Sequence, residues 1–142
     1  MKAIDLIINE NVYTVSVESD CRQAARIMME YEVGCLPVLD PQGRLEGIIT
    51  DRDIAIRLVA MGRSFETPVR EIMSKPVTTI HPQADAREVE HLMERHKVRR
   101  LPIVDEAGKL VGIISVSDMV HRYRGFLREH RLAEVLEGVS TP

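Results

Sequence analysis

The chain has 142 residues, a formal net charge of -3 and 44% apolar residues, which suits one compact domain or two small lobes with a real hydrophobic core. The slightly acidic balance argues against a nucleic-acid-binding protein, which would carry a strong basic surplus. No run approaches the roughly 18 apolar residues of a membrane-spanning helix, and the N-terminus does not have the pattern of a signal peptide. Two cysteines do not make a disulfide framework, so we expect a reducing, cytoplasmic setting.

The strongest pattern in the sequence is an internal repeat. Residues 12–58 and 77–123 align without a gap and share sixteen identities over 47 positions. Because the register never slips, loop lengths are preserved along with residue types. Two copies are too few for a solenoid, so we predict two half-domains that pack as a pair with pseudo-twofold symmetry.

Each copy is predicted to be a β-α-β-β-α unit, which places the chain in the α/β (α+β) class. β-branched segments favour strands, and Asp20 and Asp85 are followed three residues later by Gln or Glu, a helix-capping pattern. The first copy is expected to contain strands at 12–16, 35–40 and 45–50 and helices at 20–32 and 51–61. The second is expected to contain strands at 77–80, 100–105 and 110–115 and helices at 85–97 and 116–123.

The chain is expected to divide at the ends of the two copies. Residues 1–61 are assigned to the first repeat with a lead-in segment, and residues 62–76 to a connector with a short helix. Residues 77–124 are assigned to the second repeat, and residues 125–142 to a C-terminal helix and tail.

At the junction of the return strand and the last helix, each copy has a hydroxyl residue three positions before an aspartate. The pairs are Thr50 with Asp53 and Ser115 with Asp118. One interpretation is structural, because this spacing caps helices. The other is functional, because a strand end that opens into a helix is the usual ligand crevice of α/β folds, where a carboxylate can accept ribose hydroxyls. Aspartate is shorter than the Glu or Gln that usually completes a capping box, which favours the functional interpretation.

Basic residues concentrate in the second copy, at 94–100. This run suits a solvated helix end, where cations offset the helix dipole. The return strand, however, is expected to lie beside the strand that this run opens, so that Arg99 and Arg100 flank Asp118. A carboxylate for ribose next to Arg for phosphate is typical of nucleotide sites, so we favour phosphate binding.

Taken together, the repeated unit, the L-P-V/I-h-D strand, the D-x-x-G-x-L turn and the G-h-h-T/S-x-x-D junction resemble cystathionine β-synthase (CBS) domains, here as a tandem pair, often called a Bateman module. The resemblance covers residues from about 3 to 124. It implies a pseudo-symmetric pair that binds adenosine ligands such as AMP, ADP, ATP, NAD or S-adenosylmethionine. It also implies that the pair regulates an attached or partner protein and often forms a homodimer.

Position by position, the resemblance implies a preferred ligand site in the second copy and a weaker one in the first. The second site would combine an adenine edge, phosphate contacts and the ribose-binding junction, from Val77, Thr78, Thr79, Arg99, Arg100, Ser115, Ser117 and Asp118. The first site would combine the matching positions Val12, Tyr13, Thr14, Thr50, Arg52 and Asp53. There the pattern departs, because Gly34 and Cys35 stand where the second copy has Arg99 and Arg100. The first site therefore borrows charge from the other copy or from Arg52, binds a less charged ligand, or stays empty.

Neither a metal site nor a catalytic group emerges from the sequence. The histidines do not share a helical face, and zinc bound through Cys35 and a histidine is a remote alternative. Asp51 and Asp53 could bind Mg²⁺ beside nucleotide phosphates, but a solvated helix start is favoured for Asp51. Cys21 falls in the first turn of a predicted helix, where the helix N-terminus can lower a thiol pKa. Nucleotide-hydrolase and dehydrogenase motifs are absent from the sequence.

We therefore predict a regulatory adenine-nucleotide sensor that has no catalytic activity and needs no cofactor beyond its ligand. The alternative is a ligand-independent dimeric scaffold with the same fold. Apolar residues on the helix after the first return strand offer a homodimer interface, namely Ile54, Ile56, Leu58 and Val59. Neither nucleic acid nor a membrane is expected as a partner.

Overall fold

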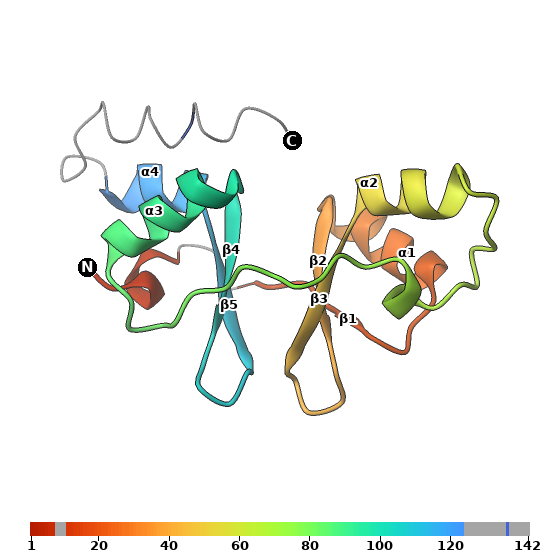
Figure 1. Cartoon of the computed structure of the whole chain (residues 1–142), viewed down its shortest axis with the longest axis horizontal. Coiled ribbons are helices and arrows are strands. Elements are labelled where there is room, and N and C mark those ends of the chain that lie inside the picture. Colours follow the sequence, from red (N-terminus) through yellow and green to blue (C-terminus); the bar gives the residue numbers. More distant parts are fainter. Residues whose placement is uncertain (8–10, 124–135, 137–142) are drawn as a thin grey trace. The chain divides into compact units, whose positions relative to one another are not determined.

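The structure is a computed structural model that describes residues 1–7, 11–123 and 136. Apart from Leu136, the predicted C-terminal helix and tail at 125–142 lie outside the described residues. The chain separates into two compact units, and Figure 1 shows that each contains a small sheet with helices beside it. The mixed helix and strand content agrees with the predicted α+β class.

The first unit along the chain spans Tyr13–Val77 and holds the first repeat. Its sheet has the order β1-β2-β3, with β1 parallel to β2 and β2 antiparallel to β3. The elements are β1 (Val15–Ser16), α1 (Cys21–Tyr31), β2 (Cys35–Leu39), β3 (Leu45–Thr50), α2 (Asp51–Asp53), the π-helical η2 (Ile54–Val59) and the short 3-10 helix η3 (Val69–Glu71). The predicted helix at 51–61 is therefore a single turn of α-helix that continues as a π-helix.

The second unit joins Met1–Val12 to Thr78–Pro142 and holds the second repeat. Its strands β4 (Arg100–Val104) and β5 (Leu110–Ser115) form an antiparallel pair. The remaining elements are η1 (Ala3–Leu6), α3 (Ala86–His96) and α4 (Val116–Tyr123). The predicted strand at 77–80 is reduced to a parallel bridge between Ile80 and Ile103, which matches the pairing of Val15 with Val38 in the first unit.

The two repeats agree in backbone detail as well as in element order. The hairpin register shifts at Val38/Leu39 and again at the matching Ile103/Val104. The two hairpin turns carry Gly43 and Gly108 at φ of 82° and 83°, a left-handed region that L side chains rarely adopt. The ungapped alignment therefore reflects a repeated backbone path.

Each lead-in segment packs on the repeat that it does not directly precede in the chain. At the N-terminus, Ala3 donates its amide to the Ala84 carbonyl over 2.7 Å, and Ala86 donates to the Met1 carbonyl over 2.8 Å. The sequence-based boundaries grouped the lead-in with the first repeat in 1–61, whereas these contacts place it in the unit of the second repeat. An apolar sequence indicates that a segment is buried but does not identify the core that it joins.

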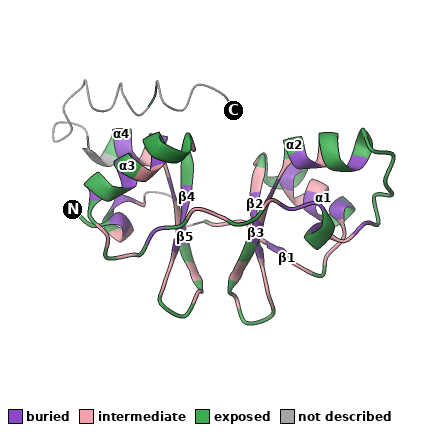
Figure 2. Ribbon diagram, viewed as in Figure 1, coloured by how far each residue is buried: buried purple, intermediate pink, exposed green. Residues whose placement is uncertain are grey.

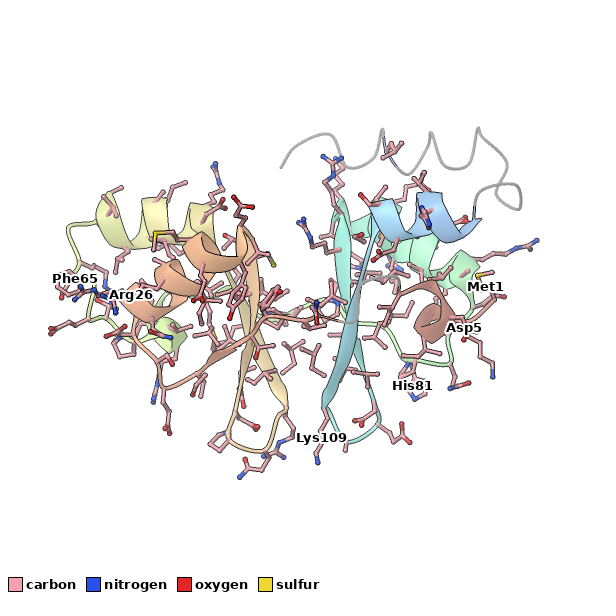
Figure 3. The ribbon with its side chains drawn as sticks, turned by 180° about the vertical axis from the view of Figure 1, so that it is seen from behind. Met1, Asp5, Arg26, Phe65, His81 and Lys109 are labelled. Atoms are coloured by element: carbon pink, nitrogen blue, oxygen red, sulfur yellow. The ribbon has the colours of Figure 1, made fainter. Side chains whose placement is uncertain are left out.

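The connector makes the equivalent contacts on the first repeat. Val69 donates its amide to the Ser19 carbonyl over 2.8 Å, and Ser74 and Ile48 exchange two backbone hydrogen bonds of 2.8 and 3.1 Å along the edge of β3. Figure 3 shows Phe65 and Arg26 near each other at one end of this unit. The Phe65 ring centroid lies 5.3 Å from the guanidinium carbon of Arg22. The connector is thereby fastened to the first repeat at both ends.

Each unit has its own hydrophobic core between the helices and the sheet, visible as buried segments in Figure 2. Leu6 of the N-terminal lead-in is fully buried in the second repeat, and Ile72 of the connector is fully buried in the first. Leu58 also belongs to the first core and Ile54 packs against that core, which corrects their assignment to a dimer surface. The turn of η2 leaves only Ile56 and Val59 of that set exposed, at 45% and 68%.

Candidate functional site

Each return strand ends in a complete reciprocal capping box. Thr50 Oγ1 accepts the Asp53 amide over 3.1 Å, and Asp53 Oδ2 accepts the Thr50 amide over 2.9 Å. In the second repeat, Ser115 Oγ accepts the Asp118 amide over 3.1 Å, and Asp118 Oδ2 accepts the Ser115 amide over 2.8 Å. The expectation that aspartate is too short for this task is wrong, because the turn brings the amide of the capping residue within its reach. The capping interpretation holds for both junctions.

The strand neighbourhood predicted for the second junction is confirmed. Arg100 lies opposite Ser115 in the antiparallel register of β4 and β5, and the Val116 amide donates to the Arg99 carbonyl over 3.0 Å. Both arginines are exposed, Ser117 is exposed, and Asp118 is half-buried. Two guanidinium groups, two hydroxyls and a carboxylate therefore come from one strand pair and the helix start that follows it.

Asp118 uses one carboxylate oxygen for the cap. Within the described part of the chain, Asp118 hydrogen-bonds to Ser115 through Oδ2 and its amide, and no hydrogen bond to Oδ1 is found there. A carboxylate oxygen that is half-buried beside basic side chains can accept hydrogen bonds from a sugar without breaking the cap. Capping and ligand binding are therefore compatible at this residue.

The first junction has the same backbone and different chemistry. Cys35 lies opposite Thr50, and the Asp51 amide donates to the Gly34 carbonyl over 3.0 Å. A Cβ built on Gly34 would lie 2.9 Å from Asp51 Oδ2, so this acid occupies the space where the second repeat carries the Arg99 side chain. The first junction thus has a carboxylate where the second has a cation.

Asp53 has partners that sequence reasoning missed. The Ser74 hydroxyl donates to its two carboxylate oxygens over 3.2 and 3.4 Å, and Arg57 Nε lies 3.8 Å from Oδ1. Arg57 also donates to the carbonyls of Ile72 and Met73. Its i,i+4 spacing from Asp53 is a signal in the sequence, whereas nothing local points to Ser74, which is 21 residues away.

The segments expected to meet adenine have no regular secondary structure and lie outside the strands. Val12, Thr14, Val77 and Thr78 are half-buried and Thr79 is exposed, and none of them belongs to a strand. Tyr13 stacks on Tyr31 of α1, with ring centroids 3.9 Å apart and planes 13° from parallel. Tyr31 stands at the position of His96, so this stacked pair belongs to the first repeat alone.

The remaining reactive candidates are limited. Burial raises the pKa of the Cys21 thiol, with a smaller contribution from the charge of Asp20, so the expected lowering by the helix N-terminus does not prevail. Arg52 is exposed, and its amide donates to Asp51 Oδ1 over 2.8 Å. Within the described residues, we find no group of three or more His, Cys, Asp or Glu side chains suited to a metal ion. The helices described are too short or too polar to cross a membrane.

Two α+β repeats, each with a capped hydroxyl–acid junction at the end of a hairpin, define the class of this protein as a tandem-repeat module. The model of the CBS domain matches residues 3–60 and 69–125. The chain therefore belongs to the CBS domain family, as the sequence motifs indicate. The second match begins at the connector, which includes η3.

Known proteins of this family resemble the chain over most of its length. It is 40% identical over 119 residues to the CBS domain-containing protein YhcV of Bacillus subtilis, covering 84% of each chain. The structure of hypoxic response protein I, which has two coordinated zinc ions, is 33% identical with a TM-score of 0.76, over 85% of this chain and 98% of that one. The CBS domain pair of protein MJ0100, in complex with 5'-methylthioadenosine and S-adenosylmethionine, is 28% identical with a TM-score of 0.72, over 88% and 97%.

Proposed function

We propose that this protein is a regulatory module that binds an adenine nucleotide, with its ligand at the second junction, and that it has no catalytic activity. The observation that carries the proposal is the register of β4 and β5, which sets Arg100 opposite Ser115 at the start of the helix that holds Asp118. The family member MJ0100 holds two adenosine compounds in its CBS domain pair, which supports the same ligand class here.

Each group at this junction has a distinct task in the proposed complex. Asp118 Oδ1 accepts hydrogen bonds from the ribose hydroxyls, while Oδ2 keeps the helix cap. Arg99 and Arg100 offer paired N–H donors to phosphate oxygens, an arrangement that favours phosphorylated adenosines over adenosine itself. Ser117, exposed in the first turn of α4, adds a hydroxyl. Residues 77–79, which belong to no strand, offer backbone groups to the adenine edge.

The output of binding is a shift between conformations that already exist. A ligand changes such an equilibrium only by its difference in affinity for the two states. Because the proposed contacts come from α4 on one side and from the start of β4 on the other, a bound nucleotide favours the state in which these elements are closest. A dimer or a partner protein in the cytoplasm would then respond to that state.

A ligand-independent dimeric scaffold is the second candidate, favoured by the apolar side chains that remain exposed on the first repeat. Val59 and Met61 are 68% and 72% exposed, and Met29 of α1 is 76% exposed. Exposed apolar side chains of this size mark an interaction surface when they form a contiguous patch. The scaffold differs from the sensor in having no nucleotide-dependent state.

Thermal unfolding against a ligand panel distinguishes the two candidates. AMP, ADP, ATP, NAD and S-adenosylmethionine are each added to the purified chain, and a ligand at 100 times its dissociation constant is expected to add about 2.7 kcal/mol of stability. A melting temperature unchanged across the whole panel contradicts the sensor and supports the scaffold. Incubation with ATP and Mg²⁺ tests catalysis, and turnover of ATP would contradict the regulatory role.

Native mass spectrometry of freshly purified protein reports the mass of any retained ligand and the number of subunits together. An adenosine compound lost from an Asp118→Asn variant would support the proposed site. The same compound retained at equal occupancy by that variant would contradict it.

A further inference from the structure

The acid of the first junction is held by the connector. Asp53 is 8% exposed, and its Oδ2 accepts the Thr50 amide, as in the second repeat. Unlike Asp118, it also receives the Ser74 hydroxyl, 3.2 Å from Oδ1 and 3.4 Å from Oδ2. Both carboxylate oxygens are therefore already engaged by the protein itself.

The basic residue next to this acid also serves the connector. Arg57 Nη1 donates to the Ile72 carbonyl over 3.2 Å and to the Met73 carbonyl over 3.3 Å, while its Nε lies 3.8 Å from Asp53 Oδ1. Arg57 thus links the acid to the two residues that precede Ser74. We call Asp53, Arg57 and Ser74 the clasp.

The described part of the N-terminal lead-in, residues 1–7, contains no serine or threonine that could give the second repeat the same hydroxyl contact. The close approach of Met73 to Gly47 is matched by the close approach of Ile7 to Gly112. Met73 is followed directly by Ser74, the residue that reaches Asp53. Among the described residues, the hydroxyl partner of the junction acid from a lead-in segment is found in the first repeat alone.

Charge separates the two repeats independently of the clasp. The end of α1 and the start of β2, residues 30–35, carry Glu30 and Glu32 and no cation. The matching residues 95–100 carry four cations and no carboxylate: Arg95, Lys97, Arg99 and Arg100. Asp51 adds a further negative charge at the first junction. Although Arg52 is exposed beside the first junction, residues 30–35 and Asp51 disfavour a phosphate there, whereas residues 95–100 favour one at the second.

We propose that the clasp occupies the hydrogen-bonding positions that a ribose would need in the first repeat, so that each chain binds one nucleotide, at the second junction. This inference rests on the proposed function. It assigns Asp53 a structural task, which is to fasten the connector that leads into the second repeat, and it leaves Asp118 as the single acid for the sugar.

Isothermal titration of the full chain with AMP measures the stoichiometry directly. We expect one AMP per chain, an affinity at least tenfold lower for Asp118→Asn, and an affinity within twofold of wild type for Ser74→Ala. Two AMP molecules per chain would overturn the inference and leave the proposed function standing. If neither AMP nor any other adenosine of the panel binds, the proposed function fails, and the single-site assignment fails with it.

Thermal unfolding without ligand tests the clasp separately from binding. Ser74→Ala is expected to lower the melting temperature by about 3 °C, since a hydrogen bond to a carboxylate is lost. Ser64→Ala is the matched control, because Ser64 is an exposed serine of the same connector whose hydroxyl accepts the exposed Glu66 amide over 3.1 Å, and its melting temperature should fall by less than that of Ser74→Ala. Equal effects of the two variants would overturn the clasp, whatever the titration shows.

Discussion

Ser115 and Asp118 hold each other through two hydrogen bonds, 2.8 Å from the Ser115 amide to Oδ2 and 3.1 Å from the Asp118 amide to Oγ. These two bonds cap α4 through Asp118 Oδ2, and they fix the other carboxylate oxygen, Oδ1, at the start of the helix. Capping and the proposed ligand binding therefore use the same local geometry, and single substitutions can separate their energies.

Removing the cap hydroxyl should affect stability, and removing the acid charge should affect binding. Ser115→Ala is expected to lower the free energy of unfolding without ligand by about 1 kcal/mol, the usual worth of an N-cap. Asp118→Asn keeps an oxygen acceptor for the Ser115 amide, so it should cost less than Ser115→Ala while AMP affinity falls at least tenfold. Urea denaturation and titration measure the two effects. A larger stability loss for Asp118→Asn with unchanged AMP affinity would leave the acid as a cap alone.

Arg100 should discriminate between ligands with and without phosphate. Arg100→Ala is expected to weaken AMP binding by about tenfold to a hundredfold, or roughly 1.4 to 2.8 kcal/mol, and to leave adenosine binding almost unchanged. Arg95→Ala is the control, because Arg95 is exposed in the last turn of α3 and belongs to no strand of the junction. An equal loss of AMP affinity in both variants would indicate a diffuse charge effect rather than a phosphate contact.

The repeat predicted most of the fold. Sequence identity at matched positions predicts the element order and the hairpin turns at Gly43 and Gly108. It also predicts the strand pairing that sets Arg100 opposite Ser115. These features depend on local residue types and on loop length, both of which an ungapped alignment preserves. The same alignment also predicts that the first junction lacks the two arginines, because Gly34 and Cys35 stand at the positions of Arg99 and Arg100.

The sequence did not predict contacts between segments that are far apart in the chain. The sequence shows that Leu6 and Ile72 lie in apolar lead-in segments. Each segment nevertheless completes the core of the repeat that it does not directly precede. Hydrophobic periodicity indicates which face of a segment is buried, but it does not identify the core against which that face packs. Ser74 gave no signal, because its bond to Asp53 depends on how the connector crosses β3. Average preferences favour Glu or Gln over aspartate in a capping box, whereas the actual hydrogen-bond distance depends on the local turn.

Gly47 of β3 and Gly112 of β5 occupy matching positions but should differ in their tolerance of a methyl group. A Cβ on Gly47 would lie 2.7 Å from Met73 Sδ and 3.0 Å from the Ser74 carbonyl oxygen, which is backbone. A Cβ on Gly112 would meet Ile7 Cδ1, the end of a side chain that can rotate away. Gly47→Ala is therefore expected to cost about 1 to 3 kcal/mol in urea denaturation and Gly112→Ala clearly less. The reverse order would mean that the connector yields more easily than the N-terminal lead-in.

The two cysteines should react at very different rates. Cys21 is fully buried, and burial raises its thiol pKa, so it reacts slowly; Cys35 is partly exposed. Iodoacetamide at mildly alkaline pH followed by peptide mass spectrometry should label Cys35 first. The raised pKa of Cys21 also means that its contribution to stability is complete below the pKa of the unfolded thiol and is lost as the pH rises through the folded pKa. Labelling of Cys21 as fast as of Cys35 in the native protein would contradict its burial.

Substitutions in the lead-ins should destabilise the repeat on which each segment packs rather than the repeat that follows it in sequence. Leu6 and Ile72 are both fully buried, so Leu6→Ala and Ile72→Ala are each expected to cost about 2 to 5 kcal/mol. Hydrogen exchange measured by peptide distinguishes their targets, because local opening follows the unit that lost its packing. Leu6→Ala should speed exchange in α3 and β5, and Ile72→Ala should speed it in α1 and β3. Faster exchange in α1 and β3 for Leu6→Ala would instead return the N-terminal lead-in to the first repeat, because hydrogen exchange reports the core that a side chain supports.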